Sequence, residues 1–428
     1  MVAEGYKQTE VGVIPEDWKV KFIGGISDVI RGASPRPKGD KRYYGGPVPR
    51  LMVEDVTRDG KYVIPIVDSL TEQGAKLSRP CKKGTLTIVC SGTVGVTSFL
   101  GVDSCIHDGF LGLVNISKTT SKDYIYHQLS SLRESFDNAA THGGVFTNLT
   151  TTGVREFPLA LPPTLAEQEA IAWALSDADG LIESLEQLIE KKRQIKQGAM
   201  QQLLTGKKRL KGFGEASQKY KQTEIGMIPE DWNLKKVNQF AEVKSGKRLP
   251  KGNELMVLQT PHPYIRVADM EMGRVSLKDI RYVPENIYPK IAHYRIYKED
   301  IFISVAGTLG IVGVIPRILN GANLTENANR FTNIKISQMF LYYQLCSSRI
   351  QNMIDGIKTV GAQPKLALTR IREFLVPLPP TRAEEDSIAQ TLSDMDTEIT
   401  TLETKLSKAK QIKQGMMQEL LTGKTRLI

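Results

Sequence analysis

The sequence predicts an α+β protein in which two mixed α/β domains are joined by two long helices that form an antiparallel coiled coil, with an internal pseudo-twofold. Two repeats carry this prediction. Residues 6–18 (YKQTEVGVIPEDW) return at 220–232 as YKQTEIGMIPEDW, and residues 157–210 align without a gap on 374–427, with more than half of the positions identical. A period of half the chain exceeds the roughly 20–50 residues of a solenoid unit, so it indicates two tandem copies of one domain and one connector.

The length, composition and net charge of the chain fit this organisation. A chain of 428 residues is long enough for two or more domains, and 40% hydrophobic residues are too many for a disordered protein. The net charge of +10 favours a polyanionic partner. The polar N-terminus shows no export signal, and no apolar run reaches the ~18 residues of a membrane span. We therefore expect a cytoplasmic protein without membrane contact.

The residues that usually bind metals or cofactors show no suitable pattern. Four cysteines and five histidines lack metal-ligand spacing, and no position among them is repeated between the halves. Residues 161–164 (LPPT) have Leu where a methyltransferase motif needs an Asn, and residues 421–425 (LTGKT) follow Gln418 where a P-loop needs Gly. We expect no metal, no cofactor and no catalytic residue, although a histidine–serine or histidine–cysteine dyad stays open.

The two mixed domains are predicted at residues 1–155 and 216–370. Short β-branched runs at 62–64, 86–89 and 301–305 predict strands between frequent Gly and Pro residues. The central segments of the two halves differ in sequence. Short motifs nevertheless occur at equivalent positions in both, as in Ser91-Gly92-Thr93 and Ala306-Gly307-Thr308. One scaffold is therefore expected to carry two different surfaces.

Long helices are predicted within the connecting segments 156–215 and 371–428. Thr164 with Glu167, and Thr381 with Glu384, have the spacing of a capping box, in which each side chain satisfies a backbone N–H at the other position. Gly206 and Gly423 are the expected helix stops. Apolar residues at alternating steps of four and three predict a coiled-coil seam, made of Ile171, Leu175, Ala178, Ile182, Leu185, Ile189, Ile388, Leu392, Met395, Ile399, Leu402, Leu406 and Ala409.

Charge predicts how the two helices pair. Each helix is acidic near its N-terminal end and basic near its C-terminal end, from Glu167 to Lys196 and from Glu384 to Lys413. An antiparallel arrangement places opposite charges beside each other, whereas a parallel one places like charges together. Single charges can equally belong to a solvated face, but the same gradient occurs in both copies.

Basic, aromatic-laced loops are the clearest candidates for nucleic-acid contact. Residues 31–46 (RGASPRPKGDKRYYGG) combine five cations with two tyrosines, and Gly and Pro keep the segment irregular. The Gly-Thr-x-Gly turns can bring N–H groups to phosphates, although tight hairpin turns explain them equally well. The candidates are Arg31, Arg36, Lys38, Lys41, Arg42, Tyr43, Tyr44 and Thr93 in the first half, and Lys244, Lys247, Arg248, Lys251 and Thr308 in the second.

The motifs together resemble the specificity subunit of type I restriction–modification systems. The matching pieces are VGVIPEDW, the PLPPT-AE opening, the LSD-D step and the K-IKQGMMQ-LLTGK helix end, in order and twice. Residues 361–366 (GAQPKL) also resemble the family's pattern before the second helix, which adds Gln363 and Lys365 to the candidates. The first half departs there, since residues 144–149 (GVFTNL) lack the Gln-Pro pair.

The resemblance implies two target-recognition domains, at 1–155 and 216–370, that read the two halves of a bipartite, asymmetric site in double-stranded DNA. It implies two docked methyltransferase subunits and further restriction subunits, with no chemistry in this chain. Gly198 and Gly415 cost up to about 1 kcal/mol each inside strong helices, which suggests close approach by a partner helix or a docked subunit. The alternative from another class is a duplicated coiled-coil adaptor that binds no nucleic acid.

Overall fold

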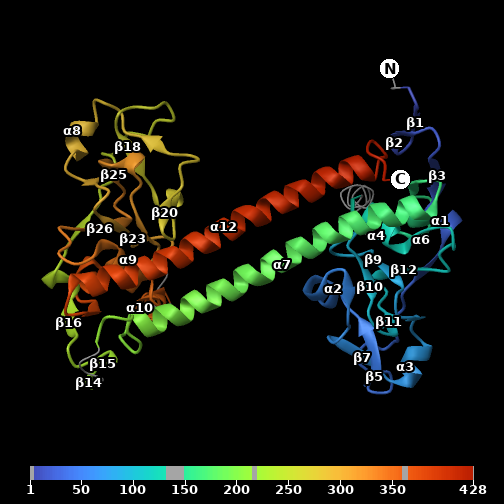
Figure 1. Cartoon of the computed structure of the whole chain (residues 1–428), viewed down its shortest axis with the longest axis horizontal. Helices are drawn as coiled ribbons and strands as arrows, with labels where there is room; N and C mark the ends of the chain where they lie inside the picture. The colour runs from blue at the N-terminus through green and yellow to red at the C-terminus, as the bar shows by residue number, and fades with distance from the viewer. Residues whose placement is uncertain (1–3, 132–148, 215–218, 359–364, 428) are drawn as a thin grey trace. The chain divides into compact units, whose positions relative to one another are not determined.

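The computed structural model describes residues 4–131, 149–214, 219–358 and 365–427. The chain divides into two compact units. Unit 1 comprises residues 1–186 and 404–428, and unit 2 comprises residues 187–403. Each unit therefore contains one mixed domain together with a portion of both long helices, α7 (Leu165–Leu203) and α12 (Arg382–Leu420) (Figure 1). No helix of the described residues is long and apolar enough to cross a membrane.

Unit 1 is built on two small sheets. The first has the strand order β4-β12-β9-β10-β6 and the second has the order β7-β5-β11-β8. The strands of these sheets are β4 (Asp28–Arg31), β5 (Tyr44–Leu51), β6 (Tyr62–Val63), β7 (Asp68–Leu70), β8 (Pro80–Cys81), β9 (Leu86–Val89), β10 (Thr97–Leu100), β11 (Ser104–Ile106) and β12 (Phe110–Val114).

The rest of unit 1 surrounds these sheets. Two short antiparallel pairs, β1-β2 and β3-β13, lie where the domain joins the long helices. These elements are β1 (Tyr6–Thr9), β2 (Gly12–Pro15), β3 (Lys19–Phe22), β13 (Pro158–Leu161), α1 (Ile23–Ile26), α2 (Val53–Asp59), α3 (Glu72–Lys76), α4 (Lys122–Ser131) and α6 (Thr151–Arg155).

Unit 2 repeats this plan with different side chains. Its two main sheets have the orders β17-β26-β23-β24 and β21-β18-β25-β22. Their strands are β17 (Glu242–Ser245), β18 (Pro263–Ile265), β21 (Arg281–Tyr282), β22 (Arg295–Ile296), β23 (Ile301–Ser304), β24 (Val312–Val314), β25 (Ala322–Leu324) and β26 (Ala328–Thr332). The predicted strands at 62–64, 86–89 and 301–305 are confirmed as β6, β9 and β23.

The remaining elements of unit 2 also follow the first unit. Pairs β14-β15 and β16-β27 answer β1-β2 and β3-β13, and β19-β20 forms a further short hairpin. The elements are β14 (Tyr220–Thr223), β15 (Gly226–Pro229), β16 (Asn233–Lys236), β19 (Met270–Glu271), β20 (Arg274–Val275), β27 (Leu375–Leu378), α8 (Tyr288–Ile291), α9 (Gln338–Cys346), α10 (Ser348–Lys358), α11 (Leu368–Arg372), η1 (Val237–Gln239), η2 (Val267–Asp269) and η3 (Arg317–Leu319).

The predicted helix signals are confirmed in part. The hydroxyl of Thr164 accepts a hydrogen bond from the N–H of Glu167 at 3.2 Å, and Thr381 does the same for Glu384 at 3.3 Å. The second half of the expected capping box is wrong, because both glutamate carboxylates bind arginines instead. Gly206 and its counterpart Gly423 follow the helix ends with φ of +71°, the left-handed conformation that a helix stop requires.

The antiparallel direction is visible inside each unit. In unit 2 Lys192 binds Glu398 at 2.6 Å, and Lys196 binds Asp396. In unit 1 Lys413 binds Asp179 at 2.5 Å, and Lys410 binds Glu186 at 2.6 Å. Residue numbers along α12 fall as those along α7 rise, so the acidic portion of each helix pairs with the basic portion of the other.

The predicted seam residues are all buried or half-buried. Those nearest the helix starts pack into the domains rather than only between helices. Ile171 and Leu175 belong to the core of unit 1 that contains Trp18, and Ile388 and Leu392 belong to the corresponding core of unit 2. The long helices are therefore continuous with the domain cores, which accounts for their position in each unit.

In each unit, an arginine that follows the long helix of the other repeat binds two carboxylates. In unit 1, Arg426 binds both carboxylate oxygens of Glu167 and both of Asp17, and its guanidinium lies 5.8 Å from the ring of the fully buried Trp18. Glu167 is only 5% exposed. We call this arginine, its two carboxylates and the tryptophan the closing cluster.

The closing cluster of unit 2 has the same geometry. Arg209 reaches the two oxygens of Glu384 at 2.7 and 2.5 Å and Asp231 at 2.7 Å, beside Trp232. Glu384 is 1% exposed. Taking a carboxylate such as that of Glu384 out of water is costly unless it is paired and hydrogen-bonded. The repeated arginine meets that requirement in both units.

Replacing Arg426 with Ala leaves the buried carboxylate of Glu167 without its main partner. We expect the free energy of unfolding to fall by about 3 kcal/mol, measured by urea denaturation of the full chain. The exposed Lys424→Ala variant is the matched control and should stay within about 0.5 kcal/mol of the parent chain. An Arg426→Ala chain as stable as that control would show that the cluster does not hold unit 1 together.

A second repeated cluster differs between the units. Gln128 donates to the carbonyl of Leu421 in unit 1 as Gln344 donates to that of Leu204 in unit 2, so the residues before them, His127 and Tyr343, are counterparts. The hydroxyl of Tyr343 contacts Asp396 at 2.8 Å. His127 is fully buried, and its Nε2 lies 3.1 Å from Ser176, while its Nδ1 lies 4.0 Å from Asp179 without a hydrogen bond. The charged groups that face His127 are Lys61, Asp123, Asp179 and Lys413.

Burial, followed by the nearby charge of Lys61, lowers the pKa of His127 from 6.5 to about 4. The folded chain therefore resists protonation that the unfolded chain accepts. The stability due to neutral His127 is complete above pH 6.5 and is lost as the pH falls from 6.5 towards 4. The difference corresponds to about 3 kcal/mol over that window.

Replacing His127 with Tyr installs the residue of unit 2 and removes this titration. We expect the loss of stability between pH 6.5 and 4, followed by thermal unfolding, to become shallower than in the parent chain. The exposed His293→Gln variant serves as control and should keep the parent pH dependence. Equal slopes for the His127→Tyr and parent chains would rule out His127 as the acid-sensitive group.

Candidate nucleic-acid interface

Backbone hydrogen bonds at Gly32 and Ala33 fix the start of the basic loop of unit 1. We call residues 32–43, between β4 and β5, the first crossing loop. The N–H of Gly32 donates to the carbonyl of Phe110 at 2.9 Å, and that of Ala33 donates to Ile106 at 3.1 Å. A Cβ at Gly32 would lie 1.9 Å from the carbonyl oxygen of His107, so a side chain cannot fit where the loop passes over the strand ends.

Unit 2 holds its basic loop in the same way. The second crossing loop comprises residues 246–262, between β17 and β18. Gly246 donates to the carbonyl of Ala328 at 3.1 Å, and Lys247 donates to Leu324 at 2.8 Å. A Cβ at Gly246 would lie 2.1 Å from the carbonyl oxygen of Thr325. The two basic segments that the sequence matched by composition are therefore structural counterparts.

A buried side chain of the second sheet anchors each crossing loop. Arg50, which is 1% exposed, binds Asp68 at 2.6 Å and reaches the hydroxyl of Ser34. Tyr264 occupies the equivalent strand position and donates its hydroxyl to the carbonyl of Lys247 at 2.9 Å. Sequence reasoning missed both anchors, because a lone Arg or Tyr in a strand gives no signal of a loop contact.

The candidates of unit 1 do not all face solvent freely. Arg36 is 72% exposed, and Lys38 and Lys41 are exposed. Arg42 is paired with Asp40 at 2.7 Å, and Arg31 donates to the carbonyl of Asp108 at 3.2 Å.

The two tyrosines have structural roles in the loop. Tyr44 donates its hydroxyl to the carbonyl of Pro35 at 2.7 Å, and the ring of Tyr43 lies 5.3 Å from the guanidinium of Arg42. Both side chains are half-buried. Tyr44 is thereby held against the loop backbone, and Tyr43 lies beside Arg42.

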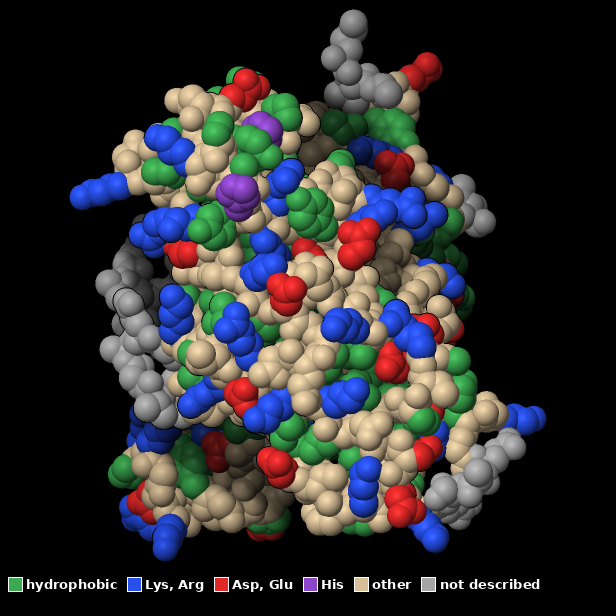
Figure 2. Space-filling view, turned by 90° about the vertical axis from the view of Figure 1, so that its left-hand side faces the viewer, with side chains coloured by type: hydrophobic (Ala, Val, Ile, Leu, Met, Phe, Trp, Pro, Cys, Tyr) green, Lys and Arg blue, Asp and Glu red, His purple; other side chains and the backbone are tan. Residues whose placement is uncertain are grey.

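Unit 2 presents a similar set of cations. Lys244 pairs with Glu242 at 2.6 Å, and Lys247 lies 5.8 Å from the ring of Tyr294. Arg248 is 75% exposed, and Lys251 is exposed. Figure 2, which looks at the molecule from the side of unit 2, shows Lys and Arg side chains spread across this face among fewer acidic ones.

An acidic residue faces each crossing loop, and neither was among the sequence candidates. We use the name acidic turn for residues 107–109 of unit 1 and residues 325–327 of unit 2, each of which joins two strands. Asp108 lies 3.6 Å from Arg36, and Glu326 binds Arg248 at 2.6 Å. An equivalent acid–arginine contact thus occurs beside both basic loops.

Local contacts explain the charge state of both acids. Burial alone would raise the pKa of Asp108, but the hydroxyl of Ser34 and the neighbouring cations lower it overall. Burial would likewise raise the pKa of Glu326, but its hydrogen bonds with Arg248, with the backbone and with Thr325 together lower it overall. The ring of His107 accepts the N–H of Gly109 at Nδ1 and contacts Asp108 through Nε2 at 2.8 Å, while burial lowers its pKa.

The Gly-Thr-x-Gly segments form hairpin turns. Gly95 donates to the carbonyl of Val89 at 2.9 Å in the turn between β9 and β10, and Gly310 donates to Ser304 at 3.0 Å between β23 and β24. Thr93 and Thr308 are exposed on these turns. Both turns are hydrogen-bonded to the acidic turn of their unit, through Cys90 to Gly109 and Val305 to Asn327. Crossing loop, acidic turn and hairpin turn therefore meet at one place in each unit.

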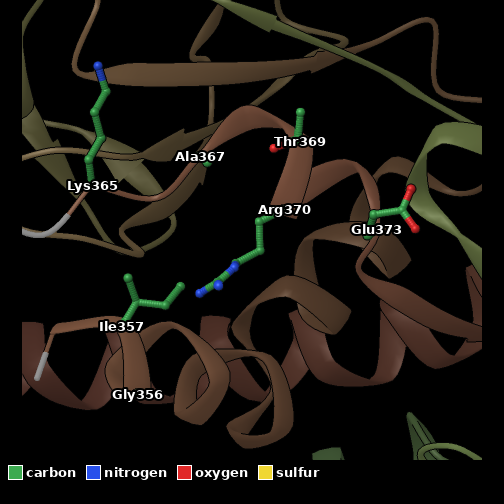
Figure 3. A pocket seen from close by; sticks show the side chains of 7 residues that line it. All are labelled: Gly356, Ile357, Lys365, Ala367, Thr369, Arg370 and Glu373. Atoms are coloured by element: carbon green, nitrogen blue, oxygen red, sulfur yellow. The ribbon is translucent and has the colours of Figure 1, made fainter. Parts of the chain in front are cut away.

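Of the two remaining candidates, Lys365 precedes Leu366, whose N–H donates to the carbonyl of Val305 at 3.0 Å. Gln363 lies outside the described residues. Lys365 lines a pocket of about 680 Å³ between α10 and α11. Figure 3 shows its side chain pointing away from Arg370, whose guanidinium turns towards Ile357. No convergent cationic site is formed by these side chains.

The two helix glycines have open surroundings. A Cβ at Gly198 or Gly415 would meet nothing within 4 Å, so the pairing of α7 and α12 does not demand glycine at either position. Within the described part of the chain, no group of three or more His, Cys, Asp or Glu residues could hold a metal ion.

Comparison with known proteins identifies the class. The family model described as a type I restriction modification DNA specificity domain matches residues 15–196 and again residues 229–413. The two matches cover most of the chain and coincide with the internal repeat. The chain belongs to the type I restriction–modification specificity family and contains two copies of its domain.

Individual relatives agree along the full length. The chain is 26% identical over 433 residues to the type I restriction enzyme MjaVIII specificity subunit of Methanocaldococcus jannaschii, covering 99% of this chain and 96% of that protein. The S subunit crystal structure from M. genitalium superposes with a TM-score of 0.57 at 17% identity, covering 94% of this chain and 96% of that one. A chain from a type I system studied for complex assembly and conformational transition gives 0.57 at 12% identity, covering 96% and 99%. These structures share the fold.

Proposed function

We propose that this chain is the non-catalytic, DNA-reading subunit of a type I complex, in which each unit reads one half of a bipartite, asymmetric site in double-stranded DNA. The observation that carries this proposal is the repeated meeting of crossing loop, acidic turn and hairpin turn, with different side chains in the two units. Because the two units have equivalent backbone arrangements, we expect them to contact DNA in equivalent ways. Because their side chains differ, we expect the two half-sites to differ in sequence.

The partners follow from the same proposal. Two methyltransferase subunits dock along the helix pair, and restriction subunits join the larger assembly. The target adenine is then flipped into a pocket of the methyltransferase, because this chain offers no cofactor signature. The boundaries 1–155 and 216–370 for the reading domains, with connectors 156–215 and 371–428, belong to this proposal.

A salt titration tests the DNA-binding step. Binding of the complex with its methyltransferase partner to duplex DNA should weaken steeply as salt rises, because cations that neutralise phosphates release counterions. Methylation mapping in cells that carry both genes should then yield two half-sites of different sequence around an unread spacer. Salt-insensitive binding, or no methylated motif, would favour the duplicated adaptor instead.

Helix length should set the spacer. Within unit 2 Lys192 of α7 binds Glu398 of α12, so one heptad inserted after Lys192 and another after Thr397 keep the seam in phase. Seven residues add about 10 Å to each helix. We expect a longer spacer with both half-sites unchanged, read by methylation mapping. If the chain with lengthened helices methylates the parent motif, helix length does not set the spacer.

Gly415 tests subunit docking. Gly415→Leu should raise the stability of the isolated chain by up to about 1 kcal/mol, because glycine is a poor helix former and a Cβ there meets nothing. The same variant should lose methyltransferase on co-purification if the subunit approaches the helix at this glycine. Gly180→Leu, at an exposed and unrepeated glycine of α7, is the matched control. Full retention by Gly415→Leu would exclude docking there.

A further inference from the structure

An exposed arginine of unit 2 is held in place by a covered carboxylate. Arg248 of the second crossing loop donates through Nε to Glu326 at 2.7 Å, and its terminal nitrogen lies 2.6 Å from the same oxygen. The side chain of Arg248 is 75% exposed, whereas that of Glu326 is 25% exposed. The carboxylate is itself fixed by the hydroxyl of Thr325 at 3.1 Å.

This arrangement is poorly explained as a stabilising device. Exposed ion pairs contribute little to folding, because solvent screens the charges and a long side chain must be ordered. The backbone next to Arg248 is already fixed, since Lys247 is hydrogen-bonded to Leu324 and to Tyr264. A guanidinium that is ordered yet exposed keeps its outer N–H groups directed at solvent, where a ligand can accept from them.

Charge distinguishes between the two parts of DNA that an arginine can contact. A phosphate is attracted by net positive charge, and Glu326 cancels that charge beside Arg248 while adding a repulsive carboxylate. The base edge of guanine is neutral and offers two acceptors, O6 and N7, that match two parallel N–H groups of one guanidinium. The exposed Lys251 of the same loop has the compact positive charge that suits a phosphate.

We infer that Arg248, oriented by Glu326, is a specificity-determining residue that reads a guanine in the half-site of unit 2. The inference rests on the proposed DNA-reading function and deepens it. Glu326 is then a positioning residue, since it touches Arg248 and not the base. The outer guanidinium N–H groups donate to O6 and N7 in the major groove, and the neighbouring lysines set the register on the phosphates.

Unit 1 has a looser version of the same arrangement. Ser34 is the loop residue that corresponds to Arg248, and it contacts Asp108 together with the exposed Arg36 two residues later. The Arg36–Asp108 distance of 3.6 Å is longer than the pair in unit 2, and Asp108 is shared with His107. The two half-sites are therefore read with different side chains around the same turn.

The experiment maps methylation by the full complex carrying Arg248→Gln, Arg248→Lys or Glu326→Gln. Arg248→Gln should reduce discrimination at one G·C position by about 5- to 150-fold and leave the other half-site unchanged. Arg248→Lys should lose part of that preference, because lysine cannot form the two-pronged contact. Glu326→Gln should relax the same position, since the amide holds the guanidinium less firmly. Lys278→Gln removes one exposed charge of the same unit and should keep the parent motif.

Three outcomes would overturn the inference. The parent motif could contain no G·C pair in the affected half-site, or Arg248→Gln could leave the motif intact. Arg248→Gln could also weaken binding equally on all sequences and reduce the salt dependence, which identifies a phosphate contact. Each of these results requires the parent complex to bind and methylate DNA. A parent complex that does neither contradicts the proposed function itself and is thereby distinguished from failure of the Arg248 inference.

Discussion

Two buried glutamates at the starts of the long helices constrain the whole chain. Glu167 and Glu384 are 5% and 1% exposed, and each is paired with an arginine. A carboxylate removed from water needs a charged partner with good geometry, and in each unit this partner is an arginine from the helix end of the other repeat. Neither domain is therefore complete with its own repeat alone. The antiparallel direction of α7 and α12 follows from this exchange, and the ion pairs along the helices agree with it.

Comparison of the two units distinguishes contacts that recur in both from side chains that differ between them. The closing clusters, the glycine crossings and the hydrogen bonds between hairpin and acidic turns recur in both units because each solves a backbone or burial problem. The anchor of the crossing loop does not recur as a residue type, since Arg50 and Tyr264 reach the loop by different chemistry. Backbone geometry is kept while the side chains that face solvent differ. This combination suits a protein that reads two different sequences with one scaffold.

The polar cluster around His127 shows that buried positions differ as well. Unit 2 satisfies the corresponding aspartate with the hydroxyl of Tyr343, whereas unit 1 leaves Nδ1 of His127 and one oxygen of Asp179 without hydrogen bonds. Unpaired buried polar atoms cost stability, so unit 1 is the more acid-sensitive half at this contact. The two junctions between domain and helix thus have the same arrangement of elements, but their polar contacts contribute differently to stability.

The duplication, the two long helices, their antiparallel pairing and the family resemblance could all be predicted from the sequence. These features depend on periodicity, charge order and motifs that are read along one segment at a time. Only the folded chain shows the partners of Glu167 and Glu384, which the capping-box spacing assigned to the wrong atoms, and the acidic turns of Asp108 and Glu326. Arg426 lies 259 positions from Glu167, and Glu326 lies 78 from Arg248. Contacts over such separations leave no periodic trace in the chain, because they depend on where the backbone crosses itself.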